Sequence, residues 1–226
     1  MEDTYNLLGH ALRKALGVIA RQQGRGLAEM ASEAQASLVG GSSLKAALDR
    51  DWDDPDQREQ ALGLVLEALN AVEHWLDSQP EGADAPVVQY SMAAAVQVKQ
   101  QDIEFPAAGR ATLRKGVAKE RRITIEDAQM RHGRKSRRVR VDGYKRHVLR
   151  DLDTGLVRAV GITPANVAEA SVTEAIRADL ACQQVMLGEL HIDRAYLSST
   201  LVRERSAELL IYCKAWSVRN LSLIHI

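Results

Sequence analysis

The first hundred residues carry apolar side chains at the three- and four-residue steps that are typical of amphipathic helices. Asp3 is placed to cap the first of these helices, and the sequence GRG at 24–26 ends it. A second, alanine-rich helix is predicted over 27–38, before a break at 39–43. The apolar face of the first helix consists of Leu8, Leu12, Leu16 and Ile19.

The clearest helix start in the chain is Asp54-Pro55-Asp56-Gln57. Asp54 suits the N-cap, Pro55 the first helical position, and Gln57 can reach back to the cap. An apolar stripe follows this helix start, and packing within this region explains it more readily than binding of a cofactor does. We expect a loop over 78–86 and a last helix over about 87–104, which Pro106 closes. The stripe is formed by Leu62, Val65, Leu66, Leu69, Val72 and Leu76.

From about residue 141 the pattern changes to short apolar runs separated by turn signals. A first strand leads into a hairpin turn at 151–156, and a β-branched central strand follows over 156–163. Asn166 can cap a helix that runs to about Cys182. A strand at 187–192, a helix near 198–206 and a strand at 208–216 complete the order.

This order predicts an α/β sheet with crossover helices. We therefore divide the chain into a helical region (1–105), a basic connector (106–140) and an α/β core (141–226). In sheets of this kind, functional sites gather at the carboxyl ends of strands.

The net charge of zero conceals a strong asymmetry along the chain. Residues 1–109 hold 8 Lys/Arg and 17 Asp/Glu, whereas residues 110–150 hold 15 and 4, a net charge of +11. Residues 151–226 hold 7 and 9. A cluster this dense fits either a solvated loop or a polyanion partner, and nucleic acid is the usual polyanion.

Two further features bear on the compartment. The chain has neither an apolar run long enough to span a bilayer nor a start that resembles a secretory signal, so we expect a cytoplasmic protein. Cys182 and Cys213 lie far apart without metal-ligand spacing, which favours two reduced, buried thiols.

The stretch GELHIDRAY at 188–196 raises the question of chemistry. An apolar strand ends abruptly on Asp193, followed by Arg194 and Tyr196. One interpretation is a solvated carboxylate at a strand end, and the other is an acid held at the edge of a sheet for catalysis. For Arg194 and Tyr196, packing and phosphate contact are equally open.

A series of short motifs follows in order along the second half of the chain: Met130–Lys135, Asp142–Lys145, Asp153–Gly155, Thr163–Asn166 and Glu169, followed by 191–199 and 212–220. Together these motifs resemble the core of bacterial insertion-sequence transposases of the DDE type. The resemblance is dense over 123–220, present at 2–16 and thin in the helical middle. The stretch 191–199 looks like the strand tip that carries the second catalytic aspartate in that family.

This resemblance implies a partial RNase H-like mixed sheet, with crossover helices, preceded by an all-helical region. In the family, three carboxylates hold two divalent ions, Mg²⁺ or Mn²⁺, for phosphoryl transfer on DNA. Asp193 corresponds to the second of these acids, which makes it the candidate catalytic and metal-binding residue. Lys214, on the next strand, either approaches that site or is an ordinary edge lysine.

The other two acids of the family are expected outside this chain. The first should precede Met1, since Asp3 matches a position downstream of it. The third is a glutamate on a later helix, and Glu204 and Glu208 come too early for it. The ending LSLIHI has no acid, so the resemblance implies a fragment that lacks the first catalytic strand and the C-terminal catalytic helix, with an open apolar edge in its sheet.

The expected function is therefore that of a transposase fragment, whose complete form cuts and joins DNA at insertion-sequence ends. The alternative is a catalytically inactive DNA-binding remnant, and a nuclease with the same core is a weaker third. The implied partners are double-stranded DNA at the nucleoid and a second copy of the chain, with no membrane. The candidate DNA-binding residues are Arg131, Arg134, Lys135, Arg137, Arg138, Lys145 and Arg146, while a metal role for His132 or His147 has little support.

Overall fold

The computed structural model describes residues 3–107, 109–116, 118, 120–134 and 138–213. The chain forms two compact units, and their boundary runs through a β-hairpin. Unit 1 comprises Met1–His132 and Ser136–Asp142, and unit 2 comprises Gly133–Lys135 and Gly143–Ile226. The mixed α/β architecture with a preceding helical region is as predicted, and it is compatible with a partial RNase H-like fold.

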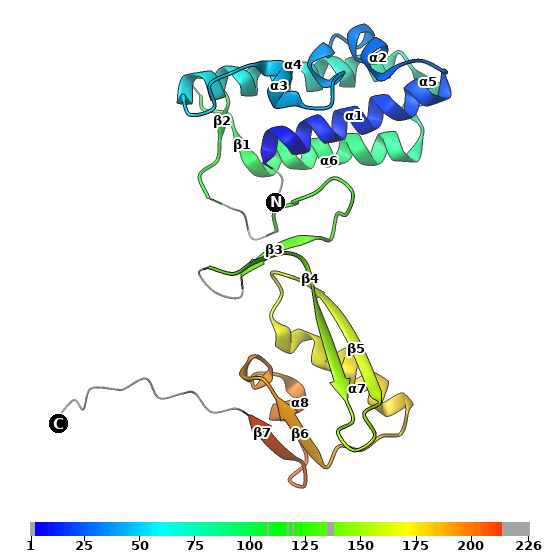
Figure 1. Ribbon diagram of the computed structural model, residues 1–226, viewed down its shortest axis with the longest axis vertical. Helices are drawn as coiled ribbons and strands as arrows, with labels where there is room; N and C mark the ends of the chain where they lie inside the picture. The colour runs from blue at the N-terminus through cyan, green and yellow to red at the C-terminus, as the bar shows by residue number, and fades with distance from the viewer. Residues whose placement is uncertain (1–2, 108, 117, 119, 135–137, 214–226) are drawn as a thin grey trace, which may run out of the picture. The chain divides into compact units, whose positions relative to one another are not determined.

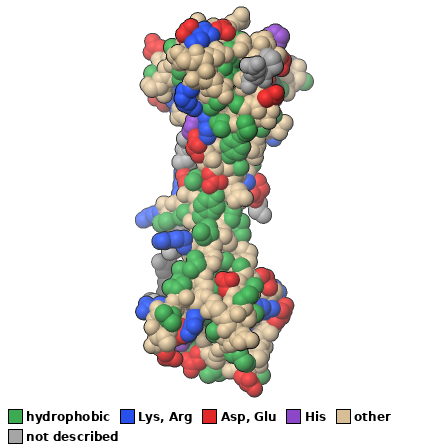
Figure 2. Space-filling view, turned by 90° about the vertical axis from the view of Figure 1, so that its right-hand side faces the viewer, with side chains coloured by type: hydrophobic (Ala, Val, Ile, Leu, Met, Phe, Trp, Pro, Cys, Tyr) green, Lys and Arg blue, Asp and Glu red, His purple; other side chains and the backbone are tan. Residues whose placement is uncertain are grey.

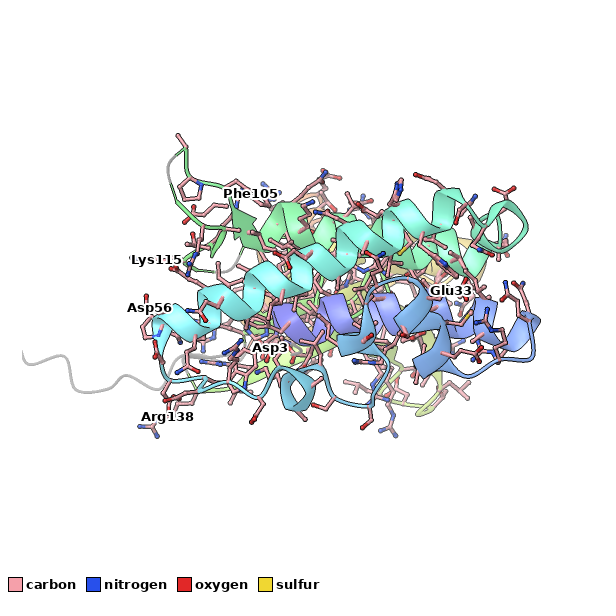
Figure 3. All side chains as sticks on the ribbon, turned by 90° about the horizontal axis from the view of Figure 1, so that it is seen from above. Asp3, Glu33, Asp56, Phe105, Lys115 and Arg138 are labelled. Carbon is pink, nitrogen blue, oxygen red and sulfur yellow. The ribbon has the colours of Figure 1, made fainter. Side chains whose placement is uncertain are left out.

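Unit 1 is built on three long helices (Figure 1). Helices α1 and α4 run in the same direction and α6 returns against them (Figures 1 and 3). Short elements connect the long helices, including a short helix inside the expected loop at 78–86. The helices are α1 (Thr4–Gln22), α2 (Leu27–Glu33), η1 (Ser37–Val39), α3 (Leu44–Leu48), α4 (Pro55–Asp77), α5 (Pro80–Ala83) and α6 (Pro86–Asp102).

Local signals fix where the two first long helices begin. The Asp3 carboxylate accepts the Asn6 N–H at 2.9 Å at the start of α1. At the start of α4, Asp54 accepts the Asp56 N–H at 2.8 Å and the Gln57 side-chain amide at 3.1 Å. Both predicted caps are therefore confirmed, and each satisfies backbone donors that have no partner within their helix.

The core of unit 1 is made of the stripes read from the sequence. Leu8, Leu12, Leu16 and Ile19 of α1 are fully buried. They join the predicted stripe of α4 and the buried side of α6 in one apolar cluster. The alanine-rich helix is shorter than predicted, because α2 ends at Glu33 and a separate 3₁₀ turn follows.

A segment after α6 folds back onto the helices of unit 1. The short strands β1 (Ile103–Glu104) and β2 (Thr112–Leu113) pair antiparallel. Further along, Ile123 and Ile125 are buried at 2% and 0% exposure. Ile125 belongs to the same apolar cluster as the helices, so part of the basic stretch contributes to the core.

Unit 2 begins with an antiparallel hairpin. Strands β4 (Arg140–Arg150) and β5 (Val157–Pro164) pair with His147 opposite Gly161, and the four-residue β3 (Arg131–Arg134) neighbours β4 in the sheet. The Asp151 carboxylate accepts the N–H groups of Asp153 and Thr154 at the turn, and Gly155 takes φ 73°. The predicted hairpin turn is confirmed.

The helix after β5 begins later than predicted. Helix α7 (Thr173–Cys182) follows the 3₁₀ turn η2 (Glu169–Val172), so Asn166 is not its N-cap. Residues before it form a turn in which the Val167 N–H donates to the Pro164 carbonyl at 3.0 Å. Lys145 on β4 donates to the Val167 carbonyl at 2.8 Å, which fastens this turn to the hairpin.

The remaining strands form a sheet of their own. Strands β6 (Glu189–Ile192) and β7 (Leu210–Cys213) pair in parallel, and η3 (Arg194–Tyr196) and α8 (Thr200–Arg203) connect them. This is the predicted crossover, with shorter elements. Among the described residues β6 and β7 are not hydrogen-bonded to β4 or β5.

Unit 2 has a small core and exposed apolar side chains. Ala159, Val172, Ile176 and Leu180 are buried between the hairpin and α7. On the other face of the hairpin several large apolar side chains remain exposed, and Figure 2 shows hydrophobic surface on this unit. They are Val148, Val157, Val160 and Ile162.

Two sequence expectations have direct outcomes here. Cys182 and Cys213 are free cysteines, but neither is buried as expected: Cys182 is exposed because it ends α7 at the surface, and Cys213 is half-buried. Within the described part of the chain, no helix has the length and apolar character needed to cross a membrane.

Candidate functional site at the end of strand β6

Asp193 follows β6 directly, at the carboxyl end of the strand. Its carboxylate Oδ1 accepts the Ala195 N–H at 3.1 Å, so Asp193 caps the 3₁₀ turn η3. Asp193 remains exposed. The predicted position of Asp193 at the strand end is therefore confirmed. Its Oδ1 atom is hydrogen-bonded to the backbone, and Oδ2 takes no part in that hydrogen bond.

A buried histidine connects the turn after Asp193 to the hairpin. His147 Nδ1 lies 2.6 Å from the Tyr196 hydroxyl, and its Nε2 lies 2.9 Å from the Thr163 hydroxyl. His147 is 3% exposed, and its ring meets the Tyr196 ring edge-on with centroids 5.8 Å apart. A neutral imidazole satisfies both contacts, by donating from one ring nitrogen and accepting at the other.

The electrostatics of this cluster favour the neutral forms. Burial lowers the pKa of the His147 imidazole, while the Glu169 carboxylate acts in the opposite direction. Burial also raises the pKa of the Tyr196 hydroxyl, and the carboxylates of Glu169 and Asp193 add to that rise. The polar groups beside Asp193 thus form an uncharged hydrogen-bonded chain between three elements.

The described residues do not by themselves make a metal centre. Nowhere in the described part of the chain do three or more His, Cys, Asp or Glu side chains converge as metal ligands. His147 is occupied by its two hydroxyl partners, and Asp193 is a single carboxylate. Two divalent ions need several convergent carboxylates, so the donor set around Asp193 does not fit that cofactor alone.

The predicted DNA-binding residues fall into two groups. Arg131 makes intramolecular contacts to the Glu120 carboxylate at 3.1 Å and to the Ala128 carbonyl at 2.6 Å. Lys145 lies 3.6 Å from the Glu169 carboxylate and also holds the Val167 carbonyl. Arg134, Arg138 and Arg146 are exposed, whereas Lys135, Arg137 and also Lys214 lie outside the described residues.

His132 has a carboxylate partner within unit 1. Its Nδ1 lies 2.6 Å from the Asp142 carboxylate. This hydrogen bond holds the pKa of Asp142 below its ordinary value. The pair joins the ends of β3 and β4, which gives His132 a structural role in the hairpin.

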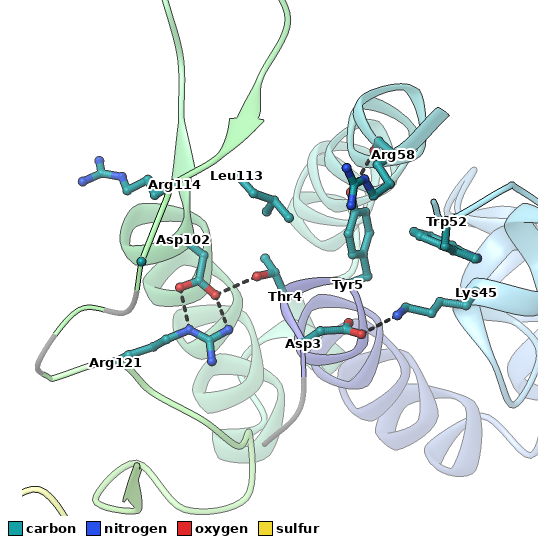
Figure 4. A pocket seen from close by; sticks show the side chains of 11 residues that line it. Asp3, Thr4, Tyr5, Lys45, Trp52, Arg58, Asp102, Leu113, Arg114 and Arg121 are labelled. Atoms are coloured by element: carbon teal, nitrogen blue, oxygen red, sulfur yellow. Dashed lines mark hydrogen bonds and ion pairs between the residues drawn. The ribbon is translucent and has the colours of Figure 1, made fainter. Parts of the chain in front are cut away.

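Two buried arginines in the basic stretch were not singled out from the sequence. Arg121 donates to both Asp102 oxygens, at 2.8 and 2.6 Å, and the Thr4 hydroxyl donates to the same carboxylate at 2.8 Å (Figure 4). Arg122 is 3% exposed and donates to the Tyr90 hydroxyl at 2.7 Å. Both side chains fasten the segment to α6, and Arg121 lines a cavity of about 370 Å³ there, so neither forms part of a free basic surface.

Comparison with known families found one match, to a domain that includes the strand end. A family model described as a transposase DDE domain matches residues 106–213. The match supports a DDE-type transposase. No curated protein and no solved structure matches the chain.

The matched stretch of the transposase domain covers just under half of the chain. It contains Asp193, the His147–Tyr196 contact and the whole positively charged stretch from Arg110 to Arg150. The long helices of unit 1, from α1 to α6, lie outside it.

Proposed function

We propose that this chain acts in DNA transposition as part of a DDE-type transposase from a bacterial insertion sequence. In its complete form, the enzyme would cut and join DNA at the element ends by two-metal phosphoryl transfer, with Asp193 as one of three metal-binding acids. The observation that carries this proposal is the match of the DDE domain over the stretch in which Asp193 ends β6. Strand-end carboxylates are where such sheets place catalytic groups.

The proposed DNA contacts are the exposed arginines Arg134, Arg138 and Arg146. Clustered cations bind the DNA backbone by releasing counterions, which requires charge density more than special geometry. Arg131 and Lys145 take part by holding the neighbouring backbone at the carbonyls of Ala128 and Val167. Lys135 and Arg137 complete the proposed set from the sequence alone.

A second candidate is a DNA-binding protein that does not cut. It is favoured by the lack of convergent metal ligands around Asp193 within the described residues. Both candidates share the arginines and the DNA partner, and they differ in whether two further acids meet Asp193. The comparison of binding with cleavage therefore separates them.

The first test is binding of the whole chain to a labelled DNA duplex at several salt concentrations. Replacing Arg134, Arg138 and Arg146 together by Gln should lower the slope of log K against log salt by about 2.7, at about 0.9 per lost phosphate contact. A matched control replaces three exposed arginines from other parts of the chain, Arg21, Arg58 and Arg203. Equal losses in both variants would show only a net-charge effect, and a salt-independent affinity would count against DNA binding.

The second test is incubation of supercoiled DNA with Mg²⁺ or Mn²⁺. The chain alone should bind but leave the DNA uncut, because one carboxylate cannot hold two ions. Nicking that the substitution Asp193→Asn abolishes would instead assign an active site to the chain as it stands. Nicking that survives this substitution would point to a contaminating nuclease.

A further inference from the structure

The cavity of about 370 Å³ in unit 1 lies where the residues after β1 fold onto the helices (Figure 4). Two parts of the chain form its walls. Tyr5 and Trp52 belong to the helical region outside the transposase-domain match, whereas Leu113 and Arg114 lie inside it. A volume of this size falls within the range of about 300–1,000 Å³ that is typical of small-molecule sites. We call this space the unit 1 cavity.

The charged side chains around the unit 1 cavity are mainly basic, although unit 1 is acidic over most of its length. Residues 1–109 hold 8 Lys/Arg and 17 Asp/Glu, yet four of the six charged side chains that line the cavity are basic. Both acids are paired with one of these cations. Asp3 Oδ2 lies 2.5 Å from Lys45 Nζ, and Asp102 accepts two hydrogen bonds from Arg121.

The other two cations, Arg58 and Arg114, are available to a ligand. Both are exposed, and neither makes an ion pair with a described residue. Arg114 Nε donates to the Ile103 carbonyl at 3.2 Å, which leaves the two terminal nitrogens of this guanidinium for other partners. Nη1 of Arg121 is buried and makes no hydrogen bond within the described part of the chain. The cavity thus carries uncompensated positive charge, which stabilises a bound anion.

Two aromatic rings give the same cavity an apolar wall. Trp52 is half-buried and Tyr5 is 4% exposed, and their rings meet edge-on with centroids 5.0 Å apart. The Tyr5 hydroxyl donates to the Arg58 carbonyl at 2.8 Å, so a guanidinium and an indole both lie beside the Tyr5 ring (Figure 4). Aromatic side chains offer a stacking surface to nucleic-acid bases of any sequence, because every base has a π-face.

We infer that the unit 1 cavity binds a nucleotide, with its base against Trp52 and its phosphate at the guanidinium groups of Arg58 and Arg114. Inorganic phosphate would use the arginines and leave the rings unused, and an uncharged ring would do the reverse. A nucleotide uses both parts of the lining. The nucleotide can be an unpaired residue of a DNA strand, an assignment that rests on the proposed function, or a free mononucleotide, which does not depend on it.

The first experiment titrates the full-length chain with thymidine monophosphate and, separately, with a short single strand of oligothymidylate. The NMR signal of the Trp52 indole N–H, assigned with the variant Trp52→Phe, should shift with either probe. Inorganic phosphate should bind at least about tenfold more weakly than the mononucleotide, because it has no base to stack. An unchanged Trp52 signal, or equal affinities for phosphate and mononucleotide, would overturn the inference.

The charge is tested with Arg58→Gln and Arg114→Gln, and Arg21→Gln is the matched control. All three arginines are exposed, and Arg21 lies at the opposite end of α1 from Tyr5. Calorimetry should show mononucleotide affinity about tenfold or more lower in the first two variants, since each loses hydrogen bonds to a charged phosphate. The control should stay within about twofold of the original chain. Equal affinities in all three variants would contradict a phosphate site at these arginines.

The stacking surface is tested by comparing Trp52→Leu with Trp52→Phe. Leucine keeps an apolar side chain for packing but has no ring, whereas phenylalanine keeps a ring. Mononucleotide affinity measured by calorimetry should be roughly five- to a hundredfold lower with leucine than with phenylalanine. Equal affinities in these two variants would exclude a base stacked at this position.

The two probes also separate the two sources of the nucleotide. Tighter binding of the single strand than of the mononucleotide assigns the cavity to DNA, and the reverse order assigns it to a free nucleotide. Replacing Arg134, Arg138 and Arg146 by Gln should leave mononucleotide affinity unchanged, because none of them lines the cavity. A chain that binds the mononucleotide but no duplex would contradict the proposed function alone. Duplex binding without any nucleotide at Trp52 would contradict this inference alone.

Discussion

The Nδ1 atom of His147 lies 2.6 Å from the hydroxyl oxygen of Tyr196, across 49 residues of sequence. Tyr196 closes the 3₁₀ turn that Asp193 caps, and His147 is buried in the hairpin. This contact thereby ties the segment that carries the candidate catalytic acid to the most regular part of unit 2. Weakening this contact should therefore make the turn that carries Asp193 less stable.

Removal of the Tyr196 hydroxyl should weaken this tie. Tyr196→Phe leaves a buried ring nitrogen of His147 without its partner, at a cost of about 1–3 kcal/mol. Hydrogen exchange of the η3 and α8 amides should then be faster by roughly ten- to a hundredfold. The control is Tyr212→Phe, because no hydrogen bond of the Tyr212 hydroxyl is present among the described residues and its ring stacks on His191. Equal effects of both variants would contradict a specific role for the His147 contact.

The same histidine should make unit 2 sensitive to acid. The folded pKa of His147 lies below its unfolded value of about 6.5, because burial penalises the charged form. Between the two values the unfolded chain binds more protons, so the free energy of unfolding rises with pH in that window. Stability should be complete above about pH 6.5 and fall as the pH drops toward the folded pKa.

The contribution of His147 to this pH dependence can be measured by comparing the original chain with a variant that lacks the imidazole. Exchange of the β4 and β5 amides is measured from pH 5 to pH 8 in the original chain and in His147→Gln. The loss of protection at low pH should be smaller in the variant, which has no titrating imidazole at that position. An NMR titration in which the His147 signal gives a pKa above about 6.5 would contradict a lowered folded pKa for this residue.

Removing one partner of the Asp102–Arg121 ion pair should destabilise unit 1 far more than replacing both partners together. Both side chains are 8% exposed, so Asp102→Ala leaves a buried guanidinium without a counter-ion and should cost about 3–5 kcal/mol in urea unfolding. The double replacement Asp102→Leu with Arg121→Met should cost much less. Asp77→Ala, which removes an exposed acid at the end of α4, should stay within about 0.5 kcal/mol.

The hairpin approaches the turn before α7 so closely that a methyl group is excluded. A Cβ at Gly161 would lie 2.1 Å from Cγ2 of Val172, which is 5% exposed. Gly161→Ala should therefore destabilise unit 2 by about 1–3 kcal/mol. The same substitution in a Val172→Ala background should cost less, since the obstructing methyl groups are gone. Gly188→Ala should be close to neutral, because beyond its chain neighbours no atom of the described residues lies within 4 Å of the added Cβ.

The helices of unit 1 could be predicted because their signals are local. The Asp54 cap, the proline after it and the apolar stripe of α4 lie within one helix, and no distant residue was needed to read them. The start of α7 was missed for the opposite reason. Lys145, more than twenty residues away, holds the Val167 carbonyl in a turn and delays the helix to Thr173.

At the candidate site, too, the features set by neighbouring residues could be predicted and those set by distant residues could not. The strand end at Asp193 follows from the abrupt change from apolar to charged residues. The hydrogen-bonded chain beside it, from Tyr196 through His147 to Thr163, involves two other strands. The sequence around Asp193 therefore could not predict these contacts. Arg121 and Arg122 looked like part of a solvated basic run, because their partners Asp102 and Tyr90 become visible only once α6 is in place.

The burial of Arg121 and Arg122 also decides where a protease can enter the chain. Residues 110–150 contain fifteen lysines and arginines, each a formal cleavage site for trypsin. Cleavage needs a locally opened backbone, and the two buried arginines are held by Asp102, Tyr90 and the core residue Ile125. The first cuts should therefore fall after exposed residues such as Arg110, Arg114, Arg134 or Arg138, and not after Arg121 or Arg122. Residues 121–125 should then stay bound to the helices of unit 1 even where the chain on either side of them has been cut.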